Sequence, residues 1–353
     1  MSDQNHKPIA IWLLCICALI FAMILLGGVT RLTESGLSMV EWKPVVGWIP
    51  PMNEAEWQDQ FQKYRQSPEY QKKNTGMSLD QFKSIFYFEF SHRVLGRLIG
   101  LAFLLPFLYF LIRRKIPRAL TPQMIIMFIL GGLQGVLGWY MVKSGLVNDP
   151  RVSQYRLTAH LISAITIYCY ILWVALGLLK PSSSRQTVTI HPENKFSIFV
   201  TALIVLQIIS GGFVAGTDAG LAYNTFPLMG DKFIPDGLMT IQPAIMNLFE
   251  NIVTIQFNHR MIAYLLIIII PIFWFKMQRS DASAKTKQLS HLLLVMLVIQ
   301  VTLGISTLLM HVPVSIASIH QGGGLVLLTL SLLINHALSK SQASYDPDQS
   351  TAV

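Results

Sequence analysis

Residues 9–29, IAIWLLCICALIFAMILLGGV, contain no charged side chain. A helix needs about 20 apolar residues to cross a hydrocarbon core about 30 Å thick. Charge-free or nearly charge-free runs of this size occur eight times in the chain, at approximately 9–29, 86–112, 120–142, 154–179, 196–216, 251–275, 289–310 and 313–337. The sequence therefore predicts an all-α integral membrane protein with eight transmembrane helices.

The composition of the 353-residue chain agrees with this prediction. Hydrophobic residues make up 52% of the chain and charged residues 13%, whereas a soluble domain carries about 25% charged residues. A disordered chain is excluded, and the net charge of +9 is expected at cytoplasmic loops rather than at a nucleic-acid-binding surface. Cys15, Cys17 and Cys169 lie within apolar runs and indicate neither a disulfide nor a metal site.

The distribution of lysine and arginine predicts how the helices are oriented. One set of loops contains eleven of them: Arg113, Arg114, Lys115, Arg118, Lys180, Arg185, Lys195, Lys276, Arg279, Lys285 and Lys287. The short loops on the other side contain three, Lys143, Arg151 and Lys232. We therefore expect both termini on the cytoplasmic side. The outer loops are then 30–85, 143–153, 217–250 and 311–312.

The first apolar run favours a bacterial inner-membrane location. The run is too long for the core of a signal peptide and lacks a small-x-small cleavage site, so we interpret it as a true first span. No Arg- and Ser-rich transit peptide precedes it, which disfavours import into an organelle.

Several features recur in the same order in the two halves of the chain. Residues 33–38, TESGLS, recur as 217–222, TDAGLA, each soon after a Gly-Gly pair. The other recurring features are His92-Arg93 with His259-Arg260, Gln134 and Gly138 with Gln300 and Gly304, and His160 with His320. We therefore predict two tandem four-helix bundles, residues 1–185 and 186–353, that form a parallel internal repeat.

The recurring histidines are candidate ligands. Only fifteen residues separate Arg97 from Arg113, and fifteen separate Arg260 from Lys276, so these two spans must include a His-Arg pair. Ionisable groups within a membrane are candidates for function. All four histidines lie near the outer ends of even-numbered spans, and a pair of facing imidazoles in a helical bundle suits axial ligation of a heme iron. The alternative is that they are hydrogen-bonded packing residues.

Charged side chains accompany these histidines. Arg93, Arg97, Arg156 and Arg260 lie within one turn or so of a histidine and are candidates for binding heme propionates. The alternative is that they extend to the outer lipid headgroups.

Glu89 distinguishes the two halves. It precedes His92 by three residues, so both project from one face of a helix, whereas the equivalent position before His259 is Gln256. A buried carboxyl can accept and release protons. The alternative is that Glu89 forms an ion pair with Arg93 or Arg97.

These residues together resemble the heme A synthase family. Residues 27–38 read GGVTRLTESGLS and are followed by Trp42, Pro44, Gly47, Pro50 and Pro51, while residues 89–93 read EFSHR. With His160, His259-Arg260 and His320, this pattern extends the resemblance from about residue 8 to about residue 337. Some bacterial members carry a cysteine pair in the first outer loop. Residues 30–85 contain no cysteine, so the chain resembles the branch shared by proteobacteria and mitochondria.

The resemblance implies a membrane oxidoreductase that converts heme O to heme A for cytochrome oxidase, through hydroxylation of a porphyrin methyl that becomes a formyl group. By position, His92 and His160 would ligate the iron of the substrate, Glu89 would be the catalytic acid or base, and His259 and His320 would ligate the iron of a permanent heme b. Membrane lipid surrounds such a protein. Further candidate partners are heme O synthase, an electron donor and a second copy of the chain, and no nucleic acid is expected.

Two mechanisms and two other functions stay open at this point. If both histidines bind the substrate iron, the methyl is oxidised by electron withdrawal and attack of water, with Glu89 accepting a proton. If one histidine dissociates, dioxygen can bind the iron. A diheme b-type cytochrome that only transfers electrons explains the histidines but not the single carboxylate. A transporter built from parallel repeats predicts a colourless protein.

Overall fold

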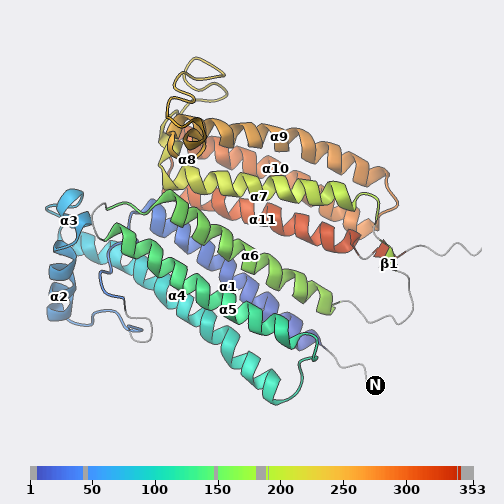
Figure 1. Cartoon of the computed structure of the whole chain (residues 1–353), viewed down its shortest axis with the longest axis horizontal. Coiled ribbons are helices and arrows are strands. Elements are labelled where there is room, and N and C mark those ends of the chain that lie inside the picture. The colour runs from blue at the N-terminus through green and yellow to red at the C-terminus, as the bar shows by residue number, and fades with distance from the viewer. Residues whose placement is uncertain are drawn as a thin grey trace, which may run out of the picture.

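The computed structural model describes residues 6–42, 47–146, 150–179, 188–189, 191–339 and 341–342. Eight of its helices are long and apolar enough to cross a membrane (Figure 1). They are α1 (Lys7–Leu32), α4 (Leu79–Ile112), α5 (Thr121–Gly145), α6 (Gln154–Leu179), α7 (Asn194–Gly216), α9 (Ile252–Arg279), α10 (Ala284–Leu309) and α11 (Val314–Leu338). The predicted all-α, multi-pass membrane protein is confirmed.

The long helices pack in two groups. Helix α1 packs on α4 and α6, and α5 packs on α4 and α6; helix α7 packs on α9 and α11, and α10 packs on the same two helices. The groups meet through α6 with α7 and α1 with α11, side by side in Figure 1. This arrangement is compatible with the predicted pair of four-helix bundles. The predicted boundary between residues 185 and 186 lies outside the described residues. So do Lys180, Arg185 and Pro44.

Side-chain hydrogen bonds join the two groups along their shared face. At the outer end, Arg31 Nη2 lies 2.9 Å from Asp218 Oδ1. One helix turn or two inward, Gln321 Nε2 donates to the carbonyl oxygen of Ile24 at 2.8 Å. Further along, the hydroxyls of Tyr168 and Thr329 lie 2.8 Å apart. Within a membrane such contacts contribute to helix association because the lipid competes for no hydrogen bonds.

The remaining elements are short. They are α2 (Glu54–Arg65), α3 (Pro68–Lys72), the 3-10 turns η1 (Ala219–Leu221) and η2 (Ala244–Met246), α8 (Asn247–Glu250), and the strands β1 (Val188–Thr189) and β2 (Ser341–Gln342), which pair antiparallel. In Figure 1, α2, α3 and α8 lie at one end of the long helices, and the start of α1 and the end of α11 lie at the other. The start of the first transmembrane helix and the end of the last therefore lie on the same side of the bundle, as an even number of spans requires.

Helix α4 starts earlier than the apolar run predicts. It has 34 residues, and its first turn is fixed by a capping box in which Ser78 accepts from the Gln81 backbone N–H and Gln81 accepts from the Ser78 N–H. These two bonds satisfy donors that a helix start leaves unpaired. The first turns of α4 thus extend beyond the apolar run, towards α2 and α3.

An outer cap, made of α2, α3 and the aromatic residues that they pack on α4, covers this extension. Tyr64 of α2 stacks on Phe82 of α4 with ring centroids 5.0 Å apart, and Trp57 meets Phe86 edge-on at 5.1 Å. All four rings are buried. Asn53 caps α2, and Ser67 caps α3, by accepting from backbone N–H groups. The outer cap thus packs on α4, a helix of the N-terminal group.

Candidate functional site

Each of the four recurring histidines packs against a glycine of the preceding long helix. A Cβ atom added at that glycine would lie 2.9 to 3.3 Å from the histidine Cε1, tighter than ordinary van der Waals contact. The pairs are His92 with Gly27, His160 with Gly138, His259 with Gly211, and His320 with Gly304. The glycines therefore give the imidazoles room, and the same local arrangement occurs four times.

The second glycine of each Gly-Gly pair faces the other group of helices. A Cβ at Gly28 would overlap the side chain of Gln321, and a Cβ at Gly212 would lie 3.0 Å from Thr158 Oγ1. The recurring pair thus does two things at once. Its first member admits an imidazole, and its second lets the two helix groups approach closely.

The recurring glutamines hold the helices that carry two of the histidines. Gln134 Nε2 donates to the backbone oxygen of His160 at 2.7 Å, and Gln300 Nε2 donates to that of His320 at 2.8 Å. The sequence showed that these glutamines recur, but their role depends on packing between helices. In each group, a glutamine and a glycine four residues later therefore fix one histidine.

The histidines lie in pairs, one pair within each helix group. His92 lies near enough to His160, and His259 to His320, for a charge on one ring to act on the other. All four remain partly exposed. Among the described residues, no group of three or more His, Cys, Asp or Glu side chains is placed to hold a metal ion. Two imidazoles are too few for a bare ion, which takes four or more ligands, but they are the number that a heme iron accepts from a protein. The donor set therefore fits heme.

Glu89 is buried, and both of its carboxylate oxygens accept hydrogen bonds. Its Oε1 atom accepts from Arg93 Nη2 at 2.5 Å and Nε at 3.1 Å, and its Oε2 atom accepts from Ser38 Oγ and the Met39 backbone N–H, both at 2.7 Å. The ion pair with Arg93 that the sequence left open is thus formed. Because Ser38 and Met39 follow α1, Glu89 also fastens the first outer loop to α4.

Gln256 occupies the equivalent place in the other helix group. Its Nε2 atom donates to the carbonyl oxygens of Tyr223 at 3.0 Å and Gly220 at 3.4 Å, in the loop that follows α7. Position 89 and position 256 therefore both fasten the loop after the first helix of their group. The carboxylate does so by accepting hydrogen bonds and the amide by donating them, so only the site beside His92 contains a proton acceptor of this kind.

The two arginines that follow the histidines bind loop carbonyls. Arg93 donates to the backbone oxygens of Met39 at 2.8 Å and Glu41 at 2.9 Å. Arg260 donates to three backbone oxygens at 2.9 to 3.2 Å, those of Tyr223, Thr225 and Leu228. Charged donors held by several carbonyls anchor a loop firmly. In this structure both guanidinium groups therefore shape the outer loops above the histidines.

The other two arginines lie against aromatic rings. Arg97 Nη1 donates to the Gly47 oxygen at 3.0 Å and its guanidinium lies over Trp48. Arg156 lies over the ring of Tyr140, 3.9 Å from the centroid, and donates to the Tyr140 hydroxyl. Arg97 is thus tied to the first outer loop, whereas Arg156 joins the start of α6 to α5.

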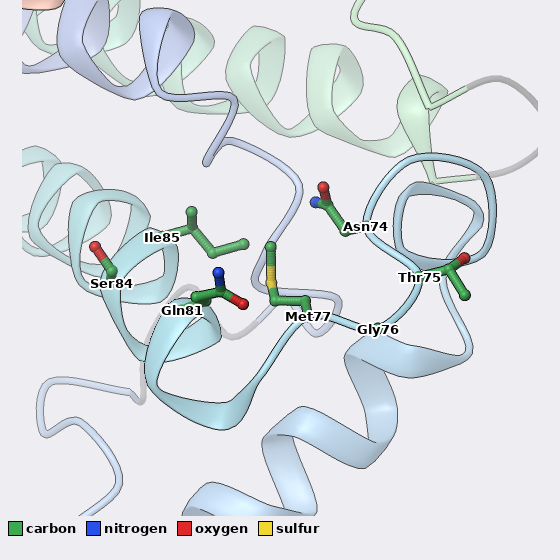
Figure 2. A pocket seen from close by; sticks show the side chains of 7 residues that line it. All are labelled: Asn74, Thr75, Gly76, Met77, Gln81, Ser84 and Ile85. Atoms are coloured by element: carbon green, nitrogen blue, oxygen red, sulfur yellow. The ribbon is translucent and has the colours of Figure 1, made fainter.

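A pocket opens beside the Glu89 network on the outer side. It is lined by Asn74–Met77, from the loop after α3, and by Gln81, Ser84 and Ile85 of α4 (Figure 2). The backbone oxygen of Ile85 accepts a hydrogen bond from Ser38 Oγ at 3.4 Å, and Ser38 donates to Glu89. Ser38 therefore forms hydrogen bonds both to Ile85, which lines the pocket, and to the Glu89 carboxylate.

Asn74 also links the pocket to a buried polar cluster in the outer cap. Asn74 Nδ2 donates to the Tyr64 hydroxyl at 2.7 Å, and this hydroxyl donates to Glu69 Oε2 at 3.0 Å. Burial raises the pKa of the Glu69 carboxyl to about 7, and the Tyr64 hydrogen bond opposes this shift. Burial likewise raises the pKa of Tyr64. Glu69 was not predicted as a functional residue from the sequence, although Ser67-Pro68 marks the start of α3 there.

The stability of the outer cap is expected to fall as pH rises towards 7. The pKa of Glu69 is about 7 when folded against 4.5 ordinarily, so its contribution is complete below pH 4.5 and is lost as pH passes 7, a change of roughly 3 kcal/mol. Hydrogen exchange of α2 and α3 between pH 5 and 8 measures it. Glu69→Gln should flatten this dependence, and an unchanged slope in that variant would assign it to another group.

Comparison with known proteins gives a consistent result. The family model of the cytochrome oxidase assembly protein COX15-CtaA matches residues 10–332. The chain is 53% identical over 343 residues to Heme A synthase of Nitrosospira multiformis, covering 96% of both chains. It is 52% identical over 338 residues to Heme A synthase of Nitrosomonas eutropha, covering 95% of both. It is 45% identical over 353 residues to Heme A synthase COX15 of Arabidopsis thaliana, covering 97% of this chain and 77% of that protein.

The family resemblance read from the outer-loop and histidine motifs is thereby confirmed over almost the whole chain. The chain belongs to the COX15-CtaA family of cytochrome oxidase assembly proteins.

Proposed function

We propose that this protein is the membrane oxidoreductase that converts heme O to heme A by oxidising one porphyrin methyl group to a formyl group. The observation that carries the proposal is the asymmetry of two otherwise matching histidine sites: Glu89 stands beside His92, whereas Gln256 stands beside His259. Both sites fit a heme, but only one contains a carboxylate. The names of relatives that are 43–53% identical over most of the chain support the same activity.

We assign the substrate to the N-terminal half, residues 1–185. His92 and His160 would ligate the iron of heme O there, because each has a partly exposed ring and the two lie near each other in one helix group. Their Nδ1 atoms are buried and have no hydrogen-bond partner among the described residues. The outer cap packs on α4 of this half and would shield the substrate from water.

Glu89 is proposed to accept protons from the reacting methyl carbon or from the attacking water. Conversion of a methyl to a formyl group with water as oxygen source releases four protons and four electrons. An external electron acceptor would have to take up the electrons, and a proton acceptor is needed near the carbon. Glu89 is buried, and Ser38 connects it to the wall of the outer pocket. The hydrogen bonds from Ser38, the Met39 N–H and Arg93 hold the carboxylate in place beside His92.

We assign a resident heme b to the C-terminal half, residues 186–353, where His259 and His320 would be its ligands. When bound, heme b supplies electron transfer. Arg260 holds three loop carbonyls above this site. Of the four arginines proposed for propionates, Arg156 donates to Tyr140 alone among the described residues, so it is the one most readily turned towards a propionate. Arg93, Arg97 and Arg260 would act through the loops that they hold.

The cellular setting follows from the loop charges. We propose a bacterial inner membrane with both termini cytoplasmic, which puts the four histidines, the outer cap and α8 on the periplasmic side. Heme O synthase and an electron donor are the proposed partners, and a second copy of the chain is a further candidate.

Expression in a host that makes heme O but no heme A tests the function directly. Chromatography of extracted hemes is expected to show heme A only when the protein is present. A purified protein that contains two b-type hemes and yields no heme A would instead be an electron-transfer cytochrome, and a protein without any heme would overturn the proposal altogether.

A further inference from the structure

The two histidine sites differ in how the imidazole Nδ1 atoms are held. In the C-terminal half, His259 Nδ1 lies 2.7 Å from Ser210 Oγ, and His320 Nδ1 lies 3.2 Å from the backbone oxygen of Gln300. In the N-terminal half, the buried Nδ1 atoms of His92 and His160 have no hydrogen-bond partner in the structure. Both histidines of the C-terminal half thus have a partner at Nδ1, and among the described residues neither histidine of the N-terminal half has one.

The partners in the C-terminal half suit one tautomer of both rings. Ser210 Oγ lies 2.8 Å from the backbone oxygen of Gln207, so its hydroxyl proton can go to that carbonyl while its oxygen accepts from His259 Nδ1. The Gln300 carbonyl can only accept, so it suits a protonated His320 Nδ1. In this tautomer both Nε2 atoms keep the lone pair that a metal requires.

Gln207, one turn before Ser210 on α7, also lies against the His259 ring. Its Nε2 atom is 3.2 Å from His259 Nε2 and 3.3 Å from His259 Nδ1, so this contact holds the ring without distinguishing its two tautomers. Two side chains on α7, Gln207 and Ser210, thus restrict how His259 can turn.

The repeat explains why His92 lacks such partners. Gly211 corresponds to Gly27, each packing on the histidine of its own half, so Ser210 corresponds to Leu26 and Gln207 to Met23. Neither leucine nor methionine offers an oxygen acceptor. The polar pair beside His259 is therefore replaced by an apolar pair beside His92.

We propose that Ser210, supported by Gln207, is a positioning residue that makes the C-terminal site retain its heme permanently, and that Met23 and Leu26 leave His92 free to reorient so that the N-terminal site can exchange heme. This inference rests on the proposed function. A site that takes in substrate and releases product has to let go of its heme, whereas a resident cofactor has to stay. Partners that orient a ligating histidine raise metal affinity about 10- to 100-fold.

The test uses the full-length protein purified with its heme b in detergent. Ser210→Ala is expected to release heme b to apomyoglobin about 10- to 100-fold faster than the parent protein and to shift the low-spin ferric EPR signal of that heme. Ser210→Thr, which keeps a hydroxyl, should restore both. Ser331→Ala is the matched control, because Ser331 is buried and donates to the backbone oxygen three residues earlier, like Ser210, but bonds to no histidine.

A reciprocal variant tests the other half of the inference. Leu26→Ser introduces an acceptor at the position that corresponds to Ser210 and is expected to increase the amount of heme O and heme A that copurifies, while slowing release of product. Heme loss from Ser210→Ala at the rate of Ser331→Ala, with an unchanged EPR signal, would overturn the proposal. If Ser210→Ala loses heme faster but no variant or parent makes heme A, the positioning role stands and the proposed function fails.

Discussion

Replacing Glu89 by glutamine is expected to lower heme A formation at least about 100-fold while heme O still binds. Loss of a positioned proton acceptor reduces rates by about 10²- to 10⁴-fold, and the amide cannot accept protons from a reacting carbon or water. His92 and His160 are unchanged in this variant, so the substrate should accumulate in its site. The measurement is chromatography of hemes extracted from the purified Glu89→Gln protein, expressed in a host that makes heme O.

A second variant separates proton transfer from loop anchoring. Glu89 also fastens the first outer loop through Ser38 and Met39, so an inactive Glu89→Gln protein alone does not distinguish the two roles. Ser38→Ala keeps the carboxylate and removes one of its donors. We expect it to retain most heme A formation. If Ser38→Ala is as inactive as Glu89→Gln, the carboxylate acts by holding the loop, and normal heme A yield in Glu89→Gln would remove it from the mechanism.

Removing either histidine of the C-terminal half is expected to abolish retention of heme b. Loss of a residue that only orients a ligating histidine already lowers metal affinity about 10- to 100-fold. Loss of the ligating histidine itself should therefore lower the affinity by more than this. Purified His259→Ala and His320→Ala proteins should therefore lack the heme b Soret band, which an absorption spectrum of equal protein amounts measures.

The matching variants in the N-terminal half provide the control. His92→Ala and His160→Ala should keep the heme b band and lose heme A formation, because they change only the proposed substrate site. If all four variants lose the same heme, the protein holds one heme between its halves rather than one in each. An unchanged Soret band in His259→Ala and His320→Ala would contradict the assignment of the resident site.

The eight spans could be predicted from the sequence because a bilayer imposes its thickness on every crossing segment. Charge-free runs such as 9–29 can be recognised as spans without knowing which helices pack beside them. The outer cap was not predicted, although Asn53 and Ser67 are the helix-capping residues that mark the starts of α2 and α3. Short helices outside the membrane carry only this weak local signal, and burial of Trp57 and Tyr64 on α4 is what stabilises them.

Sequence alone determined which residues are candidates for chemistry, because a duplication repeats the histidines and changes one carboxylate, and both are visible without coordinates. Only the tertiary structure decided what those side chains touch. It places Glu89 between Arg93 and Ser38, and an acceptor against His259 but none against His92. The reason is physical: hydrogen bonds join residues from different helices, and their partners depend on packing that no local pattern encodes.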